Sequence, residues 1–97
     1  MKPHRILALV ALLVLSAGMA EAACYADYKA KRDNPLRLHY GVIELPDQAC
    51  SGAQAAAQAI SGRIGRDGWT LLNVMSIFGP EGLDERRASA GQFYLRY

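Results

Sequence analysis

Cys24 and Cys50 are the only two cysteines of the 97-residue chain, and their pairing is the strongest constraint that the sequence places on a fold. A disulfide between them would close a loop of about 26 residues and stabilise the folded chain by about 3.5 kcal/mol on the chain-entropy model. That is a large part of the stability expected for a domain of this size. The bond persists only in an oxidising compartment, so the N-terminal residues decide whether to expect it.

Residues 1–22 have the pattern of a secretory signal peptide. A cationic start precedes an apolar stretch from Ile6 to Leu15, and small residues at Ala20 and Ala22 form an Ala-x-Ala cleavage site. An uncleaved membrane anchor would need about 20 apolar residues, which this stretch does not have. We expect cleavage after Ala22, which leaves residues 23–97 as one periplasmic or secreted domain.

Two alternatives for the cysteines have less support. Lipid modification of Cys24 resembles a motif with Leu three residues earlier, where this chain has Glu21. A copper or zinc site of Cys24, Cys50 and His39 would have no second histidine after leader removal, and its spacing matches no zinc pattern. We therefore expect a Cys24–Cys50 disulfide, and we expect neither a metal nor a cofactor.

Composition excludes several classes of protein. Apolar residues make up 52% of the chain and the mean hydropathy is +0.01, which is too apolar for intrinsic disorder. Leader removal leaves nine basic and eight acidic residues, a near balance that gives no reason to expect a nucleic-acid partner. We also expect no membrane span once the leader is removed.

Two alternating segments, Tyr25 to Lys31 and Leu36 to Leu45, flank the turn formers Asp33-Asn34-Pro35 and predict a β-hairpin. A register with Tyr28 opposite Tyr40 places six apolar residues on one face. These are Ala26, Tyr28, Ala30, Leu38, Tyr40 and Val42. The other face then holds Asp27, Lys29, Lys31, Arg37 and His39.

A helix is predicted to follow Ser51, whose hydroxyl forms a capping box with Gln54. Its buried stripe is expected at Ala53, Ala57, Ile60 and Ile64, which recur at helical spacing. The β-rich segment Trp69 to Phe78 has no polar face and predicts a central strand.

Alternation from Gln92 to Tyr97 predicts a fourth strand, antiparallel to the third, after a polar loop from Pro80 to Gly91. The expected class is α+β with two layers, a four-stranded mainly antiparallel sheet and one helix in the order β-β-α-β-β.

Part of the chain resembles a small bacterial family described as domain of unknown function 4177. The resemblance spans residues 40–97 and rests on Tyr40-Gly41-Val42-Ile43-Glu44-Leu45, Gly68-Trp69-Thr70-Leu71-Leu72-Asn73-Val74 and Phe93-Tyr94-Leu95-Arg96-Tyr97. The leader, the cysteine pair, the first strand and the longer loop after Phe78 depart from that pattern. The resemblance implies a fold, with Gly68 as a turn and Trp69 as a core anchor, and implies no activity.

The hairpin suggests one binding site, an anion patch of Lys29, Lys31, Arg37 and His39 that a phosphate, an anionic lipid headgroup or an acidic polymer would occupy. The competing interpretation is a solvated hairpin face. No catalytic motif is present, so we expect no enzyme; catalysis would have to use Asp27 or Glu44 with His39.

We therefore expect an exported, non-catalytic binding or interaction module. Its partner is an unknown protein or a small anionic ligand, with anion binding at the hairpin face as the alternative function. An open sheet face and an edge strand favour a homodimer. The loop from Pro80 to Gly91 is either a partner contact or a solvated linker.

Overall fold

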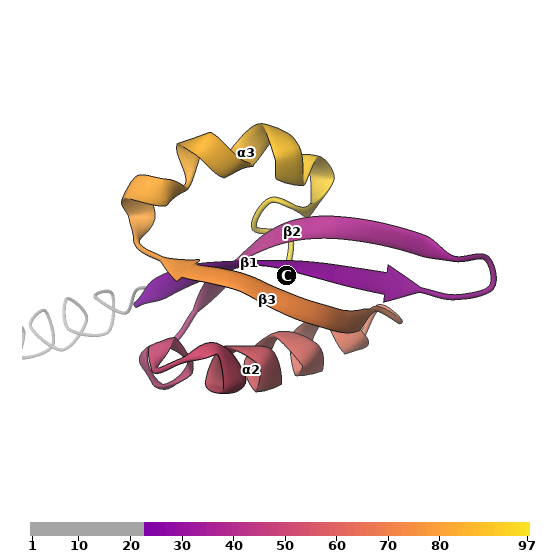
Figure 1. The fold of residues 1–97 in the computed structure, drawn as a ribbon, viewed down its shortest axis with the longest axis horizontal. Coiled ribbons are helices and arrows are strands. Elements are labelled where there is room, and N and C mark those ends of the chain that lie inside the picture. The colour runs from indigo at the N-terminus through magenta and orange to yellow at the C-terminus, as the bar shows by residue number, and fades with distance from the viewer. Residues whose placement is uncertain (1–22) are drawn as a thin grey trace, which may run out of the picture.

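The computed structural model describes residues 23–97, so the expected leader and its cleavage site lie outside the described residues. The strands and helices are β1 (Cys24–Arg32), β2 (Arg37–Leu45), α2 (Ala53–Gly65), β3 (Thr70–Phe78) and α3 (Asp84–Ala90). The strands form one antiparallel sheet in the order β2-β1-β3, with α2 on one face and α3 over the other (Figure 1). The α+β class is confirmed, whereas the prediction of four strands and a single helix is wrong.

The register of the hairpin differs by one residue from the prediction. Tyr28 lies opposite Gly41, not Tyr40. A Cβ atom at position 41 would lie 2.5 Å from the Tyr28 hydroxyl oxygen, so only glycine leaves room for this ring. The inward face of β1 is as predicted, but β2 turns its other set of side chains toward the core.

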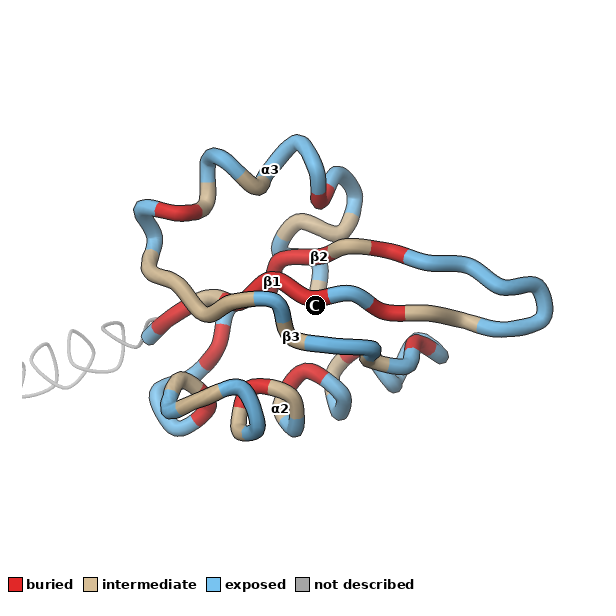
Figure 2. Tube along the Cα trace, in the orientation of Figure 1, coloured by how far each residue is buried: buried red, intermediate tan, exposed pale blue. Residues whose placement is uncertain are grey.

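The core lies between the sheet and α2, where β1 and β2 are most deeply buried (Figure 2). From α2, Ile60 and Ile64 are buried as predicted, together with Ala56 in place of Ala53 and Ala57. From the sheet and its flanks, the buried apolar side chains are Cys24, Ala26, Tyr28, Ala30, Ile43, Leu45, Ala49 and Trp69.

The predicted disulfide is present between Cys24 and Cys50, with an S–S distance of 2.06 Å. It joins the first residue of β1 to a 3-10 turn, Asp47–Cys50, that precedes α2. The predicted capping box is absent, because Ser51 donates its hydroxyl hydrogen to the Gln48 carbonyl and Gly52 occupies the N-cap position.

Gly68 and Trp69 have the roles that the resemblance implied. Gly68 has φ +84°, in the left-handed region that favours glycine, where the chain turns from α2 toward β3. Trp69 is a buried member of the core.

The segment after β3 differs most from the prediction. Instead of a loop, Pro80–Gly82 forms a 3-10 turn and Asp84–Ala90 forms α3. Residues 92–97 form no strand: after the 3-10 turn Gly91–Phe93, a single parallel bridge pairs Tyr94 with Val42 at the outer edge of β2. As a result β3, predicted to be central, is an edge strand.

Candidate functional site

The predicted anion patch is divided between the two faces of the sheet. His39 lies opposite Ala30, and Arg37 lies opposite Arg32, so both belong to the α2 face. Lys29 and Lys31 belong to the face that α3 partly covers. The prediction that these four residues share one face is therefore wrong. The four residues are divided because Gly41, and not Tyr40, lies opposite Tyr28.

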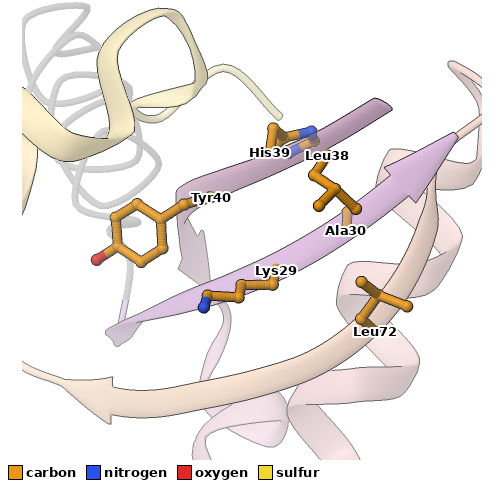
Figure 3. A pocket seen from close by; sticks show the side chains of 6 residues that line it. All are labelled: Lys29, Ala30, Leu38, His39, Tyr40 and Leu72. Atoms are coloured by element: carbon orange, nitrogen blue, oxygen red, sulfur yellow. The ribbon is translucent and has the colours of Figure 1, made fainter. Parts of the chain in front are cut away.

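An open groove lies beyond the end of α3, and we call it the leucine groove (Figure 3). Its lining includes Lys29, Leu38, Tyr40 and Leu72. Its volume is about 280 Å³ and its lining is mostly apolar. Leu38 is 66% exposed and Leu72 is 50% exposed. One ammonium at the rim of an apolar groove is not an anion site.

His39 is buried and supplies no positive charge at neutral pH. Burial, with smaller contributions from the positive charges of Arg32 and Arg96, lowers its pKa to about 4. Its ring stacks on Phe93 with the centroids 3.7 Å apart, and its Nε2 atom forms a 3.0 Å hydrogen bond with the Tyr28 hydroxyl.

A second cluster of cations replaces the predicted patch. The end of β1, the start of β2 and the C-terminal segment each contribute one arginine to a pocket of about 160 Å³, the arginine pocket. Its lining residues are Arg32, Arg37, Asp67, Trp69, Gln92, Phe93, Arg96 and Tyr97. Arg32 and Arg96 were not among the predicted site residues, because neither belongs to the predicted patch face and the expected fourth strand placed Arg96 elsewhere.

Two of the three guanidinium groups lie close to aromatic rings. The Arg32 Cζ atom lies 4.2 Å from the centroid of Trp69, and the Arg96 Cζ atom lies 5.8 Å from the centroids of Phe93 and Tyr97. Stacking uses the face of a guanidinium and leaves its in-plane N–H groups able to donate. In Arg32, one of these donors, Nη2, already binds the main-chain oxygen of Asp67.

Positive charge exceeds negative charge in this pocket. Asp67 is its only acidic lining residue, 3.6 Å from Arg32, and it accepts a 2.6 Å hydrogen bond from the Tyr97 hydroxyl. That hydrogen bond, supported by Arg32 and Arg96, lowers the pKa of Asp67, which is therefore ionised at neutral pH. Within residues 23–97, neither Arg37 nor Arg96 has a carboxylate at ion-pair distance.

Two buried nitrogens next to this pocket have no hydrogen-bond partner among the described residues. They are Nε1 of Trp69, which lines the pocket, and Nδ1 of His39, whose ring lies 4.3 Å from the Trp69 ring. Buried polar atoms are rarely left without partners in native proteins, and functional sites are one place where they occur.

Asp27 lies on the other face from His39, so the structure does not bring together the pair that catalysis would need. Its carboxylate accepts hydrogen bonds from Tyr40 (2.7 Å), Ser76 (2.6 Å) and Arg86 (3.0 Å). Burial opposes ionisation, but these three donors outweigh it and lower the pKa of Asp27. The carboxylate thereby attaches α3 to the sheet. Glu44, the other candidate partner, pairs with Tyr25 on that same face.

The rival interpretation, a metal site of Cys24, Cys50 and His39, is not supported by the geometry, since the two cysteines are bonded to each other. No group of three or more His, Cys, Asp or Glu side chains is arranged for a metal ion within the part of the chain that the structure describes. Among the helices of residues 23–97, none has the length and apolar character needed to cross a membrane.

No family model matches the chain, and neither a curated protein nor a solved structure matches it.

Proposed function

We propose that the protein is an exported, non-catalytic module that binds a small anionic group in the arginine pocket. The observation that supports this best is the convergence of three guanidinium groups on one pocket whose only acidic side chain is that of Asp67. The proposed ligand is still a small anion, as the alternative function from the sequence expected. The proposed site, however, keeps only Arg37 of the predicted patch and adds Arg32 and Arg96.

The chemistry of arginine narrows the ligand to an oxyanion. A guanidinium presents a planar fork of N–H donors that matches the two oxygens of a carboxylate or the edge of a phosphate or sulfate. A volume of about 160 Å³ accommodates one such group. The surrounding aromatic rings restrict Arg32 and Arg96, so less conformational entropy is lost on binding.

Export is supported by two features of the chain. The leader-like pattern of residues 1–22 is one, and the Cys24–Cys50 disulfide, which is stable in an oxidising compartment, is the other. Both agree with a periplasmic or secreted location.

A binding role is favoured over catalysis by the state of the titratable groups. His39 is stacked and hydrogen-bonded inside the domain, and Asp27 is held by three donors. Neither side chain lines the arginine pocket, whereas a general acid or base must lie within hydrogen-bond reach of the proton that it transfers.

Calorimetric titration tests the proposal. The disulfide-bonded protein, obtained after expression of the full chain, is titrated at low ionic strength with sodium phosphate, sulfate and acetate. We expect saturable binding of at least one of the three anions. Because a charge-assisted hydrogen bond contributes about 1.5 to 3 kcal/mol, Arg37→Ala combined with Arg96→Ala should weaken it by at least about tenfold.

The matched control is Lys29→Ala combined with Lys31→Ala, which removes the same charge from the other face of the sheet. It should leave the affinity within about twofold. Absence of saturable binding by all three anions, or an equal loss in both double variants, would contradict the proposal. Circular dichroism of each variant confirms that the fold is retained.

A further inference from the structure

The two edges of the sheet differ in how they are covered. At the β2 edge, the C-terminal segment crosses the strand, and the Leu95 amide donates a 2.8 Å hydrogen bond to the Val42 carbonyl. At the β3 edge, no described segment pairs with the strand. Alternate residues of this nine-residue strand therefore direct unpaired main-chain N–H and C=O groups outward along an open edge.

The side chains of β3 do not protect this edge. Its sequence, TLLNVMSIF, contains no charged residue, proline or glycine, whereas edge strands of monomeric proteins commonly carry charge or proline. Its irregularities are two bulges that add Leu72 and Met75 opposite β1. These two side chains are apolar and 50% and 47% exposed, so the bulges add apolar surface in place of charge.

Helix α2, which lies next to β3, also exposes few charged side chains. Helix α2 packs beneath β3 (Figure 1), and its only charged residue is Arg63. Arg63 donates hydrogen bonds to the main-chain oxygens of Glu44, at the end of β2, and of Tyr97. Its charge is thus held on the β2 side, and uncharged side chains such as Gln54, Gln58 and Ser61 occupy the exposed part of α2.

We propose that two copies of the protein pair through their β3 edges, antiparallel about a two-fold axis, to form a continuous six-stranded sheet. Neither β3 nor the exposed part of α2 carries a charge, and Lys29 is the charged side chain beside Leu72. A highly charged partner surface would therefore lose its hydration along this edge while finding few ions to pair with. A second copy avoids this loss, and it supplies an equally open strand edge with equally exposed Leu72 and Met75 side chains.

This surface is separate from the proposed anion site. No residue that lines the arginine pocket belongs to β3 or α2. Pairing of the β3 edges therefore leaves both pockets of the dimer open, and the failure of one proposal would not imply the failure of the other.

Sedimentation velocity of the disulfide-bonded protein, from about 1 µM to about 1 mM, measures the association. We expect a concentration-dependent dimer. Leu72→Lys combined with Met75→Lys places two positive charges on each edge and should raise the dissociation constant at least tenfold, because pairing of the edges then brings like charges close together. Hydrogen exchange should show greater protection of β3 amides in the dimer.

The matched control is Leu36→Lys combined with Leu38→Lys, which makes the same change at two side chains 65% and 66% exposed near the hairpin turn. It should leave the dissociation constant unchanged within about twofold. A protein that stays monomeric up to 1 mM overturns the proposal. So does an equal effect of both double variants, which would assign the contact to the hairpin and the leucine groove.

Discussion

Acidification should destabilise the domain through His39, which is 7% exposed. Its pKa is lowered from 6.5 to about 4, by burial first and then by Arg32 and Arg96. In the unfolded chain the pKa returns to its ordinary value of about 6.5. Between these two values the unfolded state binds more protons than the folded state. The free energy of unfolding therefore falls as the pH is lowered through this window, and the contribution of neutral His39 is complete above about pH 6.5.

The size of the effect follows from the two pKa values. Between pH 8 and pH 5, the linkage relation gives a loss of about 2 kcal/mol in the free energy of unfolding. For a domain with a stability of about 5 kcal/mol this is a large fraction. Carboxylates also titrate near the lower end of the range, so the contribution of His39 has to be isolated with a variant.

Urea denaturation at pH 5, 6, 7 and 8 measures this loss. Trp69, the single tryptophan of the chain, lies 4.3 Å from His39 and serves as the fluorescent probe. The variant His39→Phe retains an aromatic ring but cannot bind a proton, so we expect its stability to change less over the same range. In the wild type, nuclear magnetic resonance should show the His39 imidazole titrating near pH 4. A folded-state pKa of 6 or above would refute the reasoning, even if the variant failed to fold.

Two further predictions concern the framework of the domain. Replacing both cysteines, Cys24→Ala with Cys50→Ala, should lower the free energy of unfolding by about 3.5 kcal/mol, and the midpoint of thermal unfolding by about 20 °C for a domain of this size; a change below about 1 kcal/mol in calorimetry would show that the bond has little effect on stability. Gly41→Ala should cost at least about 1 to 3 kcal/mol in urea denaturation, because its Cβ would lie 2.5 Å from the Tyr28 hydroxyl oxygen. Gly52→Ala, where a Cβ meets no atom within 4 Å, is the control and should change stability far less.

Features that depend on local pattern were predictable from the sequence. The hairpin follows from two alternating segments around Asp33-Asn34-Pro35, and the disulfide follows from a single pair of cysteines after a segment with the pattern of a leader. The burial of Ile60 and Ile64 follows from helical spacing. In each case residues close together in the sequence determine the feature.

Features that depend on contacts between distant residues were not predictable. Alternation at Phe93, Leu95 and Tyr97 indicated a strand, but Gly91 and Leu95 both have φ +54°, and the segment crosses the β2 edge instead. That path brings Arg96 to the arginine pocket, which is why the site could not be assembled from sequence spacing.

The register of the hairpin was also not predictable from the sequence. A shift by one residue exchanges the two faces of β2, and with them the residues that face the core. The alternation of β1 and β2 permits both registers, and the choice depends on whether a tyrosine ring fits over Gly41. Every residue of the predicted anion patch on β2 moved to the other face for this reason.

The close approach of Tyr28 to Gly41 also affects His39, two residues away on β2, whose Nε2 atom forms a hydrogen bond with the Tyr28 hydroxyl. Because the phenol ring lies flat across a position that has no side chain, its oxygen extends far enough along β2 to engage Nε2 of His39. The opposite nitrogen, Nδ1, is the one left without a partner beside Trp69. A methyl group at position 41 would displace the Tyr28 ring, so a chain with alanine there would have to rebuild the hydrogen bond to His39 as well as the strand pairing.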